Sequence, residues 1–341
     1  MTVRIGINGF GRIGRNYLRA ARSLGADVEV VAINDLTSAE TLAHLLRYDS
    51  THGRFDGDIA VEDSTILLDS GPIAVLAERD PKALPWDKLG VEVVVESTGL
   101  FTTRATASAH LEAGAGRVIV STAAADVDAT FVIGVNDQEF DPAKDFVVSN
   151  ASCTTNCFVP MVKVLDDAFG IESGMMTTVH AFTNDQNLLD LPHKDLRRAR
   201  SAAINIVPAS TGAARATGLV LPSMKGRLDG SALRVPVPDG SITDFTAVIP
   251  GSVSTEAVNA AFAAAASTGP LSKVLVYTED PIVSSDIVGS PASCTFDAGL
   301  TMVMPSASGI TLVKVHGWYD NEWGYANRLV DLSLVVGGSG R

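Results

Sequence analysis

Cysteine is scarce in this chain: Cys153, Cys157 and Cys294 are the only three among 341 residues. Three thiols are too few for a disulfide framework, and this usage is typical of a reducing compartment, so we expect a cytoplasmic protein. Long apolar runs are also absent, since the longest, at residues 260–266, falls far short of the roughly 20 residues that a membrane-spanning helix requires. The first residues lead directly into a predicted strand, and no signal peptide is expected before it.

The chain also has fewer positively charged than negatively charged residues. Lys and Arg number 26 against 39 Asp and Glu, which gives a formal net charge of −13. Such an acidic chain is a poor partner for nucleic acids and anionic membranes. The exception is the basic segment 193–200, with His193, Lys194 and three arginines. A run of this kind is usually a solvated face. The alternative is a site for a small anion such as phosphate, which Arg matches with two hydrogen bonds.

A glycine-rich segment lies between a predicted strand and a predicted helix near the N-terminus. Residues 3–8 have the pattern of a buried strand, Gly9-Phe10-Gly11-Arg12-Ile13-Gly14 follows, and residues 15–21 have helical spacing. Here the first Gly permits a tight turn, the second lets the backbone approach a pyrophosphate, and the third lets the helix pack on the strand. The pyrophosphate of a dinucleotide would rest on the helix N-terminus.

An acidic residue at the end of the second predicted strand supports this dinucleotide site. Asp35 follows the apolar residues 28–34, about 20 residues after the glycines. Its carboxylate would accept hydrogen bonds from the adenosine ribose and would repel the 2′-phosphate of NADP, and Leu36 offers that phosphate no positive charge. The sequence therefore predicts NAD as the cofactor. The alternative is a solvated Asp at a strand end.

Two further predicted strands, at 90–99 and 116–121, end in small polar residues. Because ligands bind beyond the carboxyl ends of parallel strands, Thr98, Phe101 and Ser121 are candidate neighbours of the cofactor. The same residues are also explained as caps of the following helices. Residues 59–76 have the pattern of antiparallel hairpins inserted in the sheet, with a turn at 69–72.

The segment from Ser149 to Cys157, Ser-Asn-Ala-Ser-Cys-Thr-Thr-Asn-Cys, lies where a predicted strand gives way to a helix. Cys153 is therefore placed at a helix N-terminus, where free backbone N–H groups and the helix dipole favour a thiolate near neutral pH. A lone Cys is more often a small buried hydrophobe, but the polar residues around this one favour a nucleophile. Cys157 is expected in the core, with a resolving thiol as the alternative, and Cys294 in a strand without an assigned role. Two cysteines without further ligands make a poor zinc site, so no metal is expected.

His180 is the best candidate for the base that such a nucleophile needs. It lies near the end of the extended segment 174–183, whereas His44, His52 and His110 fall in helix or loop regions of the first domain. A histidine in a strand is more often structural than catalytic. A base need only be near the Cys in space, however, and not in sequence.

Three features of the second half are typical of anion sites. The segment 184–207 is a long polar and basic loop, and such loops in compact domains are usually functional. The turn at 208–214 leads into a helix, which forms a nest of backbone N–H groups. Arg234 lies in an apolar strand and needs an anionic partner, either a ligand or an internal salt bridge.

The length and these motifs predict two domains of an α/β protein. We expect an N-terminal, Rossmann-type parallel sheet that binds NAD over 1–151, joined by a C-terminal helix at 317–341. The remaining 152–316, including the loop 184–207, would form an α+β catalytic domain with a mostly antiparallel sheet. The composition, 46% hydrophobic and 19% charged, is that of an ordinary globular protein.

Together, these elements predict covalent catalysis on an aldehyde. The Cys would attack the carbonyl carbon, the hemithioacetal would pass hydride to the nicotinamide, and a second nucleophile would release the thioester. Two anion sites beside the Cys suggest a phosphorylated aldehyde and free phosphate as the two substrates.

The chain resembles the phosphorylating glyceraldehyde-3-phosphate dehydrogenases over nearly its whole length. The motifs that carry the resemblance are residues 7–15, 149–157, 179–186 (Val-His-Ala-Phe-Thr-Asn-Asp-Gln), 208–214 and 318–325. The nine-residue cysteine segment is the most specific of them. The resemblance implies oxidation of glyceraldehyde 3-phosphate to 1,3-bisphosphoglycerate in glycolysis, by a homotetramer in which the 184–207 loop packs against a neighbouring subunit's cofactor.

The resemblance also implies roles for the matching residues. Cys153 would be the nucleophile, and its backbone N–H would help to hold the oxyanion. His180 would be the general base and then a donor to that oxyanion. The phosphate of the substrate would be bound by Thr183 and Arg234. The attacking inorganic phosphate would be bound by Ser152, Thr154, Arg198, Thr211 and Gly212.

The cofactor contacts implied in the same way come from both ends of the chain. They are Gly9, Phe10, Gly11, Arg12, Ile13, Gly14, Asp35, Arg79, Thr98, Ser121, Asn321 and Tyr325. Asn321 would hydrogen-bond the nicotinamide carboxamide, with Tyr325 packed nearby. Leu36 and Pro192 are similar to residues that disfavour NADP.

The chain departs from the family pattern at two places, and two other functions compete with the one that the resemblance implies. The segment 121–125, Ser-Thr-Ala-Ala-Ala, lacks the Pro and Lys of many members, and Phe182 replaces a frequent Tyr. Erythrose-4-phosphate dehydrogenase, the nearest rival, handles inorganic phosphate poorly, and the intact Thr211-Gly212 turn argues against it. A redox-sensing binding protein built on Cys153 is the rival from another class, but it would leave Thr183, Arg234 and Asn321 without a purpose.

Overall fold

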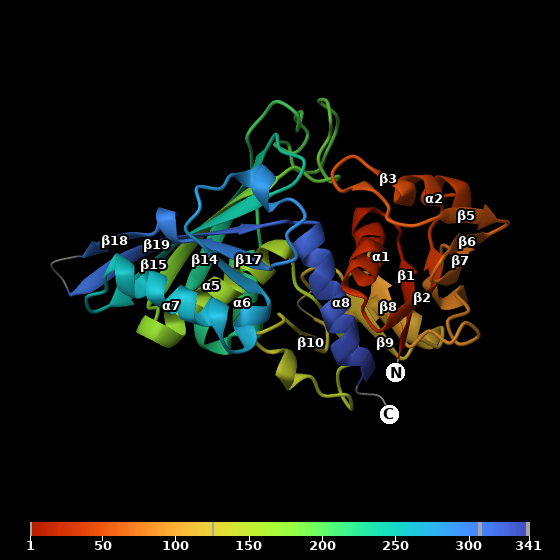
Figure 1. Ribbon diagram of the computed structural model, residues 1–341, viewed down its shortest axis with the longest axis horizontal. Helices are drawn as coiled ribbons and strands as arrows, with labels where there is room; N and C mark the ends of the chain where they lie inside the picture. Colours follow the sequence, from red (N-terminus) through yellow and green to blue (C-terminus); the bar gives the residue numbers. More distant parts are fainter. Residues whose placement is uncertain (1, 125, 306–308, 339–341) are drawn as a thin grey trace. The chain divides into compact units, whose positions relative to one another are not determined.

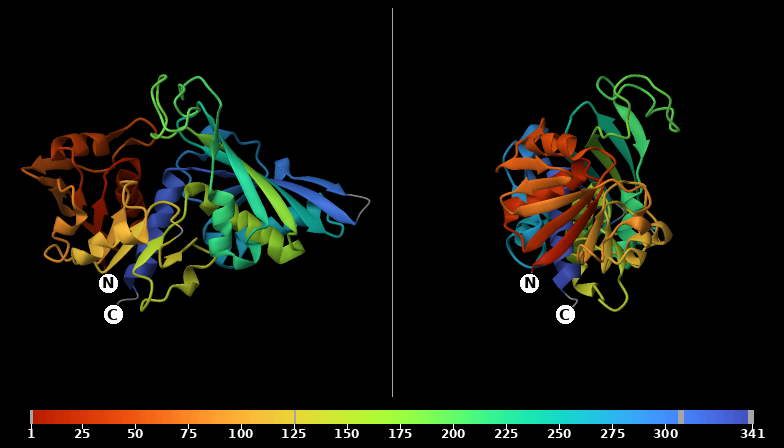
Figure 2. Two further views of the ribbon diagram at one scale, coloured as in Figure 1. Left: turned by 180° about the vertical axis from the view of Figure 1, so that it is seen from behind. Right: turned by 90° about the vertical axis from the view of Figure 1, so that its right-hand side faces the viewer.

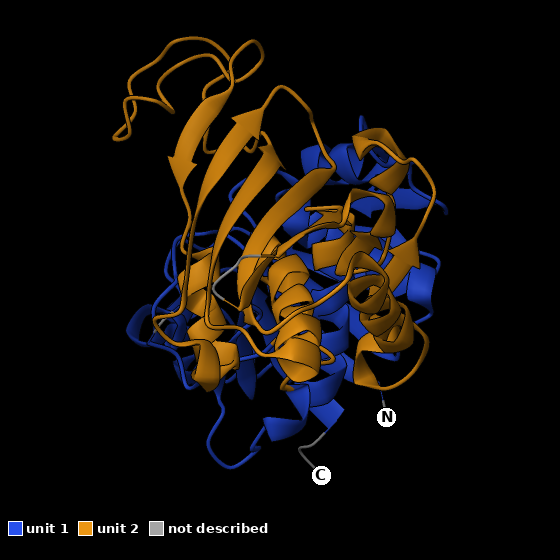
Figure 3. Cartoon of the chain, turned by 90° about the vertical axis from the view of Figure 1, so that its left-hand side faces the viewer, with its two compact units in different colours: residues 1–131, 137–151, 326–341 blue, residues 132–136, 152–325 orange. Residues whose placement is uncertain are grey.

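The computed structural model describes residues 2–124, 126–305 and 309–338. The chain divides into two compact units, which Figure 3 colours separately. Unit 1 comprises residues 1–131, 137–151 and 326–341, and unit 2 comprises residues 132–136 and 152–325. Ala125, part of the loop motif that departs from the family pattern, and residues 339–341, part of the predicted C-terminal helix, lie outside the described residues.

Unit 1 is built on a nine-stranded sheet in the order β10-β11-β9-β8-β1-β2-β7-β6-β5, whose strands run side by side in Figure 2, right. The strands are β1 Val3–Asn8, β2 Val28–Asn34, β5 Ile59–Glu62, β6 Thr65–Leu68, β7 Gly71–Leu76, β8 Val93–Glu96, β9 Arg117–Val120, β10 Ala129–Thr130 and β11 Val147–Ser149. From β10 to β7 all pairs are parallel. The predicted parallel sheet is therefore confirmed.

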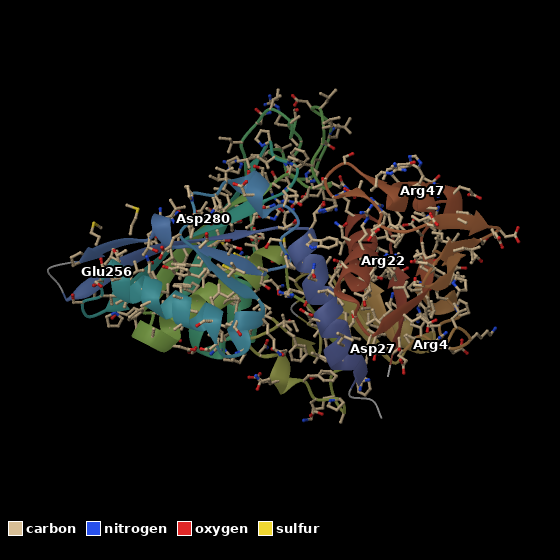
Figure 4. The ribbon with its side chains drawn as sticks, viewed as in Figure 1. Arg4, Arg22, Asp27, Arg47, Glu256 and Asp280 are labelled. Carbon is tan, nitrogen blue, oxygen red and sulfur yellow. The ribbon has the colours of Figure 1, made fainter. Side chains whose placement is uncertain are left out.

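The hairpins expected at 59–76 are also present, and they extend the edge of this sheet. Strands β5, β6 and β7 pair in antiparallel fashion, and β7 joins β2 in parallel. The turn between β6 and β7 is tied to helix α1, because Arg22, labelled in Figure 4, donates to both carboxylate oxygens of Asp69 at 2.5 and 2.7 Å. A small two-stranded ribbon, β3 Tyr48–Asp49 with β4 Gly53–Arg54, lies outside the sheet.

The helices of unit 1 are α1 Arg12–Leu24, α2 Ala39–Arg47, α3 Arg104–Ala107, α4 Ala109–Glu112 and the greater part of α8 Trp323–Gly338. Within this unit, α8 packs closely on the sheet and on α1. The Tyr17 hydroxyl bonds to Ser333 Oγ at 3.0 Å. A Cβ on Gly337 would lie 2.4 Å from Val3.

The start of the last helix differs from the prediction. The expected helix at 317–341 begins at Trp323 instead, because residues up to Tyr319 continue strand β19 with alternating burial. Asp320 then starts the helix, since its Oδ1 accepts from the N–H groups of Glu322 at 2.8 Å and Trp323 at 2.6 Å. Those donors would otherwise be unsatisfied in the first turn.

Unit 2 contains an eight-stranded mixed sheet in the order β13-β14-β12-β15-β19-β17-β16, with β18 paired to β19. The strands are β12 Ser173–Ala181, β13 Val207–Ser210, β14 Leu228–Val235, β15 Ser241–Pro250, β16 Leu275–Thr278, β17 Cys294–Asp297, β18 Met302–Pro305 and β19 Ile310–Tyr319. Only β12 with β14 and β16 with β17 pair in parallel. The predicted mostly antiparallel sheet and the strand position of Cys294 are therefore confirmed.

Helices α5 Cys153–Phe169, α6 Ala213–Val220 and α7 Thr255–Ser267 lie along one face of this sheet (Figure 1). The described residues 182–206 form no helix or strand, so the long loop predicted at 184–207 is present except for Val207, which begins β13. Short 3-10 turns lie at Pro81–Ala83, Asp137–Glu139, Pro222–Met224, Pro270–Lys273, Ser284–Ile287 and Ala298–Leu300. No helix among the described residues has both the length and the apolar character needed to cross a membrane.

Candidate active site

Cys153 is the first residue of helix α5, at the turn where strand β11 has ended. Ser152 is the N-cap, and its Oγ accepts from the Thr155 N–H at 3.1 Å. The residue before it, Ala151, adopts a positive φ of 54°, which is unusual for a residue with a side chain. Cys153 is partly exposed, whereas Cys157 and Cys294 are buried. The core position expected for Cys157 is therefore confirmed.

The register of the sheet brings polar side chains to one end of unit 2. His180 near the end of β12 lies opposite Arg234 of β14, and Ser241 at the start of β15 lies opposite Tyr319 at the end of β19. Cys153 Sγ lies 3.4 Å from His180 Nε2. The nucleophile and base candidates therefore contact each other, although they come from a helix and a strand.

The hydrogen bonds of His180 decide which ring nitrogen can act as a base. Nδ1 lies 2.7 Å from the Ala181 carbonyl oxygen, which can only accept, so this contact places the ring proton on Nδ1. Nε2 then presents its lone pair to the Cys153 sulfur. Arg234 Nη1 lies 2.8 Å from the same Nδ1 and favours the other tautomer, but it also donates to the Ala181 carbonyl at 3.1 Å.

Burial and the charge of Arg234 act on the pKa values of both members of this pair. Burial raises the pKa of the Cys153 thiol to about 11, and the positive charge of Arg234 and the hydrogen bonds from Thr154 lower it only in part. Burial, with a further contribution from Arg234, lowers the pKa of His180 to about 3. Burial thus favours a neutral thiol beside a neutral imidazole, whereas Arg234 and the hydrogen bonds at the helix N-terminus favour the thiolate. The thiolate near neutral pH stays a prediction that rests on the helix N-terminus.

The Tyr319 side chain packs against His180 and bonds to Thr154, the residue that follows Cys153. Its hydroxyl bonds to Thr154 Oγ1 at 2.9 Å and to Thr178 Oγ1 at 2.8 Å, and its ring meets that of His180 edge to face at 5.9 Å between centroids. Burial raises the pKa of Tyr319, so it remains a neutral hydroxyl. Thr154, expected to bind phosphate, is buried and uses its side chain on Tyr319 and on the Cys153 sulfur.

A cluster of charged and polar groups lies next to His180. Arg234 Nη1 donates to Thr183 Oγ1 at 3.1 Å, Thr183 donates to Asp185, and Asp185 pairs with Arg198. Among the described residues, Arg234 Nε and Arg198 Nε are buried nitrogens without a hydrogen-bond partner. Because a buried guanidinium N–H without an acceptor is costly, both arginines are suited to receive an anion.

The turn expected to bind phosphate lies between β13 and α6. Gly212 is the N-cap of α6 and provides no capping side chain, and Thr211 Oγ1 accepts from the Ala213 N–H at 3.2 Å. Arg198 reaches the preceding residue, since its Nη2 donates to the Ser210 carbonyl at 3.5 Å. The structure thus brings Arg198 to the Thr211-Gly212 turn.

Asn321 is connected to the His180 segment through Ser241. The Ser241 hydroxyl donates to Asn321 Oδ1 at 2.7 Å and accepts from the Ala181 N–H at 3.0 Å. All of these groups are buried. Asn321 and Tyr325 belong to unit 2, whereas the remaining predicted cofactor contacts belong to unit 1.

Unit 1 holds a pocket of about 350 Å³ at the carboxyl ends of its parallel strands. It is lined by Asn8, Gly9, Gly11, Asn34, Asp35, Leu36, Glu78, Arg79, Pro81, Ser97, Thr98, Leu100 and Phe101. The lining includes five of the predicted cofactor contacts, Gly9, Gly11, Asp35, Arg79 and Thr98, and also Phe101. It does not include Phe10, Arg12, Ile13, Gly14 or Ser121.

The glycines fit a dinucleotide for separate steric reasons. Gly9 has a φ of 91°, and a Cβ on Gly14 would lie 2.3 Å from the Gly9 carbonyl oxygen. A Cβ on Gly11 would meet nothing within 4 Å, so the space above Gly11 is open to a ligand. Asp35 Oδ2 accepts the Phe10 N–H at 2.9 Å and so ties the loop to the end of β2.

Some of the residues predicted to contact the cofactor form hydrogen bonds with other residues of unit 1. Arg12 donates to both oxygens of Asp49, at 3.0 and 3.1 Å. The Thr98 hydroxyl donates to Glu96 at 2.5 Å and accepts from the Leu100 N–H at 3.0 Å, but it does not cap the following helix, because Thr103 is the N-cap of α3. Ser121 extends the sheet through its N–H, which donates to the Glu96 carbonyl at 3.0 Å.

Sequence reasoning missed Asp185 and Ser241 as site residues. Asp185 lies in the motif 179–186, two residues after Thr183. Its contact with Arg198 depends on how the 184–207 loop folds back, which the local sequence does not indicate. Ser241 had no signal of its own, because it follows an ordinary turn and its partner Asn321 is 80 residues away in the chain.

Comparisons with known proteins agree with this geometry. Residues 3–104 match the family model described as glyceraldehyde 3-phosphate dehydrogenase, NAD binding domain, and residues 152–321 match the one described as its C-terminal domain. The chain is 59% identical to glyceraldehyde-3-phosphate dehydrogenase of Streptomyces coelicolor over 99% of both chains. It is 60% identical to glyceraldehyde-3-phosphate dehydrogenase 1 of Streptomyces avermitilis over 99% of both chains. It is 59% identical to glyceraldehyde-3-phosphate dehydrogenase of Mycobacterium bovis, over 99% of this chain and all of the relative. The chain belongs to the glyceraldehyde-3-phosphate dehydrogenase family.

Proposed function

We propose that this protein oxidises glyceraldehyde 3-phosphate to 1,3-bisphosphoglycerate, a step of glycolysis, with inorganic phosphate as second substrate. The observation that carries the proposal is the 3.4 Å contact between Cys153 Sγ and His180 Nε2 in a chain of this family. NAD is the cofactor, and when bound it accepts the hydride that leaves the substrate carbon.

The first step assigned to this chain is addition of the thiol to the aldehyde. The His180 Nε2 lone pair takes the proton of the Cys153 thiol as sulfur attacks the carbonyl carbon, which forms a hemithioacetal on Cys153. A neutral imidazole is required for this transfer, and burial favours that form of His180, while Arg234 lowers the pKa of the thiol and so eases loss of its proton. The backbone N–H of Cys153, at the helix N-terminus, is placed to hold the oxyanion.

The protonated His180 then stabilises the negative oxygen until the hemithioacetal becomes a thioester. Inorganic phosphate attacks the thioester carbon, the carbon–sulfur bond breaks, and the acyl phosphate leaves while Cys153 regains its proton. Ser152, Arg198, Thr211 and Gly212 are assigned to this phosphate. For Thr154 we favour its position beside the sulfur, because its hydroxyl is shared with Tyr319.

The phosphate carried by the substrate is assigned to Thr183 and Arg234. Arg234 contacts both Thr183 and the His180 segment, so a phosphate held there would place the aldehyde end near Cys153. Its buried Nε has no partner among the described residues and is therefore a donor available to the ligand.

The cofactor contacts proposed in unit 1 are those of the glycine loop with Asp35, Arg79, Thr98 and Ser121. The open space above Gly11 suits a pyrophosphate, and the Asp35 carboxylate suits the adenosine ribose. In unit 2, Asn321 and Tyr325 are assigned to the nicotinamide. We assign residues 1–151 with the C-terminal helix to NAD binding and the intervening residues to catalysis.

We also propose a homotetramer in the cytoplasm. The face of the unit 2 sheet opposite its helices leaves apolar side chains exposed, including Met175, Met302 and Met304. The 184–207 loop exposes Leu188, Leu189, Leu191, Leu196, Ile204 and Ile206. Apolar surface of this extent marks association sites. Light scattering on the purified protein tests the tetramer, and a monomeric mass would overturn it.

The function is tested by following NADH formation with glyceraldehyde 3-phosphate in the presence and absence of inorganic phosphate. We expect turnover to depend strongly on phosphate and to be far lower with NADP or with erythrose 4-phosphate. Phosphate-independent turnover, or a preference for erythrose 4-phosphate, would reject the proposal. The redox-sensing alternative predicts NAD binding without turnover.

A further inference from the structure

The Asp185 carboxylate connects the two groups of residues that we assign to the two phosphates. One oxygen, Oδ1, accepts the hydroxyl proton of Thr183, and the other, Oδ2, accepts from Arg198 Nη1. Thr183 is assigned to the phosphate of the substrate and Arg198 to inorganic phosphate. A single internal carboxylate therefore holds one donor from each site.

We propose that Asp185 is an internal competitor for both phosphates, a carboxylate that holds their donors and has to release them when phosphate binds. The inference rests on the proposed function, because it takes the assignment of the two anion sites from it. It adds a residue that sets the affinity of each site, which makes Asp185 a specificity-determining residue without contact to the reacting carbon.

The hydrogen-bonding capacity of Thr183 shows the competition most directly. Its hydroxyl has one proton, which it gives to Asp185, and one of its lone pairs accepts from Arg234 Nη1 at 3.1 Å. In this arrangement Thr183 has no proton left to donate to a phosphate oxygen. Binding of the substrate phosphate through Thr183 therefore requires that the bond to Asp185 breaks.

Arg198 is held in the same way but less completely. Its Nη1 is engaged by Asp185, and its Nη2 donates weakly to the Ser210 carbonyl at 3.5 Å. Its Nε lies 3.6 Å from Asp195, beyond hydrogen-bonding range. The guanidinium edge that a phosphate would bind in a bidentate manner is thus partly taken by Asp185.

The charge of Asp185 persists at neutral pH. Burial alone would raise the pKa of Asp185, but the Thr183 hydroxyl and the positive charges of Arg234 and Arg198 outweigh burial and lower it. An incoming phosphate therefore meets a fixed negative charge between the two arginines. Both the loss of donors and this repulsion raise the phosphate concentration needed for half-saturation.

The test compares Asp185→Asn with wild type in the NAD-coupled assay. Asn keeps the shape of the side chain and removes its charge, so we expect the KM for inorganic phosphate and the KM for glyceraldehyde 3-phosphate each to fall at least about threefold. Sulfate, used as a phosphate analogue, should raise the Tm of the variant more than that of wild type. Asp185→Ala serves as a second variant that removes the acceptors as well.

Two other carboxylates of the same loop provide matched controls. Asp190 pairs with Arg200 at 2.9 Å and accepts from the Ser201 N–H at 2.9 Å, and neither partner is assigned to a phosphate, so Asp190→Asn should leave both KM values unchanged. Asp195 lies 3.6 Å from Arg198 and accepts from the Arg197 N–H at 2.9 Å. Among the described residues it forms no hydrogen bond or ion pair with Thr183 or Arg234, so Asp195→Asn should change the KM for inorganic phosphate and not that for the aldehyde. This pattern separates competition from a general disturbance of the loop.

A role of Asp185 confined to ordering the loop would give the opposite result. Both KM values would rise in Asp185→Asn and Asp185→Ala, the Tm would fall, and sulfate would protect wild type better; that outcome overturns the inference. Unchanged KM values in a stable variant overturn it as well. Failure of the proposed function is distinguished in the wild type, because it appears there as turnover without phosphate dependence.

Discussion

Cys153 Sγ lies 3.4 Å from Nε2 of His180, and each residue is held by a different element of unit 2. The start of α5 carries the sulfur, and the end of β12 carries the imidazole. Arg234 lies opposite His180 in the neighbouring strand. The base is thus aligned by strand register and by the Ala181 carbonyl, and it does not depend on a carboxylate partner.

Loss of either member of this pair should remove most of the activity. We expect Cys153→Ala to abolish NADH formation, and His180→Asn to lower kcat by roughly 10²- to 10⁴-fold, because proton transfer from the thiol is lost. Iodoacetamide labelling with peptide mapping should mark Cys153 and spare the buried Cys157 and Cys294. A Cys153→Ala protein with normal turnover would contradict the covalent mechanism.

The reactivity of Cys153 should rise with pH through the neutral range and beyond. Burial raises the pKa of the thiol to about 11, so the thiolate fraction increases with every unit of pH up to that value. Arg234 opposes this shift. In Arg234→Gln the thiol pKa should therefore be higher still, and alkylation at a given pH slower than in wild type.

The measurement is the rate of iodoacetamide inactivation between pH 6 and pH 10, without substrate or cofactor. The wild-type rate should climb across this range, and the curve of the variant should lie at higher pH. A wild-type rate already at its plateau at pH 6 would show that the thiolate is preformed, contrary to the desolvated pair described above.

Acid should destabilise the protein partly through His180. Its pKa is lowered from the usual 6.5 to about 3 in the folded state, so between these values the unfolded chain binds a proton that the folded chain does not. The contribution of His180 to the free energy of unfolding is therefore present above pH 6.5 and is lost progressively as the pH falls from 6.5 towards 3. From pH 6.5 to pH 5 this contributes a loss of about 2 kcal/mol.

Urea unfolding at pH 7 and pH 5 checks this, with His180→Asn for comparison. The variant cannot take up the proton, so its free energy of unfolding should fall less between the two pH values. Equal pH dependence of the two proteins would mean that His180 is not buried in neutral form.

Ser241 should matter for the reaction although it does not contact the sulfur. In Ser241→Ala, the Asn321 side chain loses a 2.7 Å bond and the Ala181 N–H loses its acceptor. We expect a higher KM for NAD and a roughly tenfold lower kcat/KM, since one buried hydrogen bond is worth about 1 kcal/mol or more. Thr243→Val, which removes another buried hydroxyl of β15 not bonded to Asn321, is the control. Identical effects of the two substitutions would point to packing alone.

Substitution of two glycines in the loop 9–14 should affect folding in one case and cofactor binding in the other. In Gly14→Ala the new Cβ would lie 2.3 Å from the Gly9 carbonyl, so the Tm should drop. In Gly11→Ala the Cβ meets only open space, so the Tm should stay close to wild type while the KM for NAD rises, because the methyl group occupies the pyrophosphate position. Scanning calorimetry and NAD titration give the two readouts, and an unchanged KM in Gly11→Ala would place the pyrophosphate elsewhere.

Much of the fold and part of the site could be predicted because the relevant signals are local. The transitions from β1 to α1 and from β11 to α5 each lie within a few consecutive residues, and glycine sterics and helix capping act at that range. The start of α8 could not be predicted in this way. Residues 317–319 are bound into the sheet by β15, which lies about 75 positions earlier in the chain, and this pairing overrides the local pattern.

The sequence by itself determined which chemical groups are available: a Cys at a helix start, a glycine loop followed by Asp35, and arginines in an acidic chain. Only the tertiary structure decided how deeply these groups are buried and which other groups they contact. Burial raises the pKa of the Cys153 thiol while Arg234 lowers it, and the Asp185 carboxylate accepts from both Thr183 and Arg198. Burial and strand register depend on residues far apart in the chain, and these long-range terms set the charges and contacts with which the site operates.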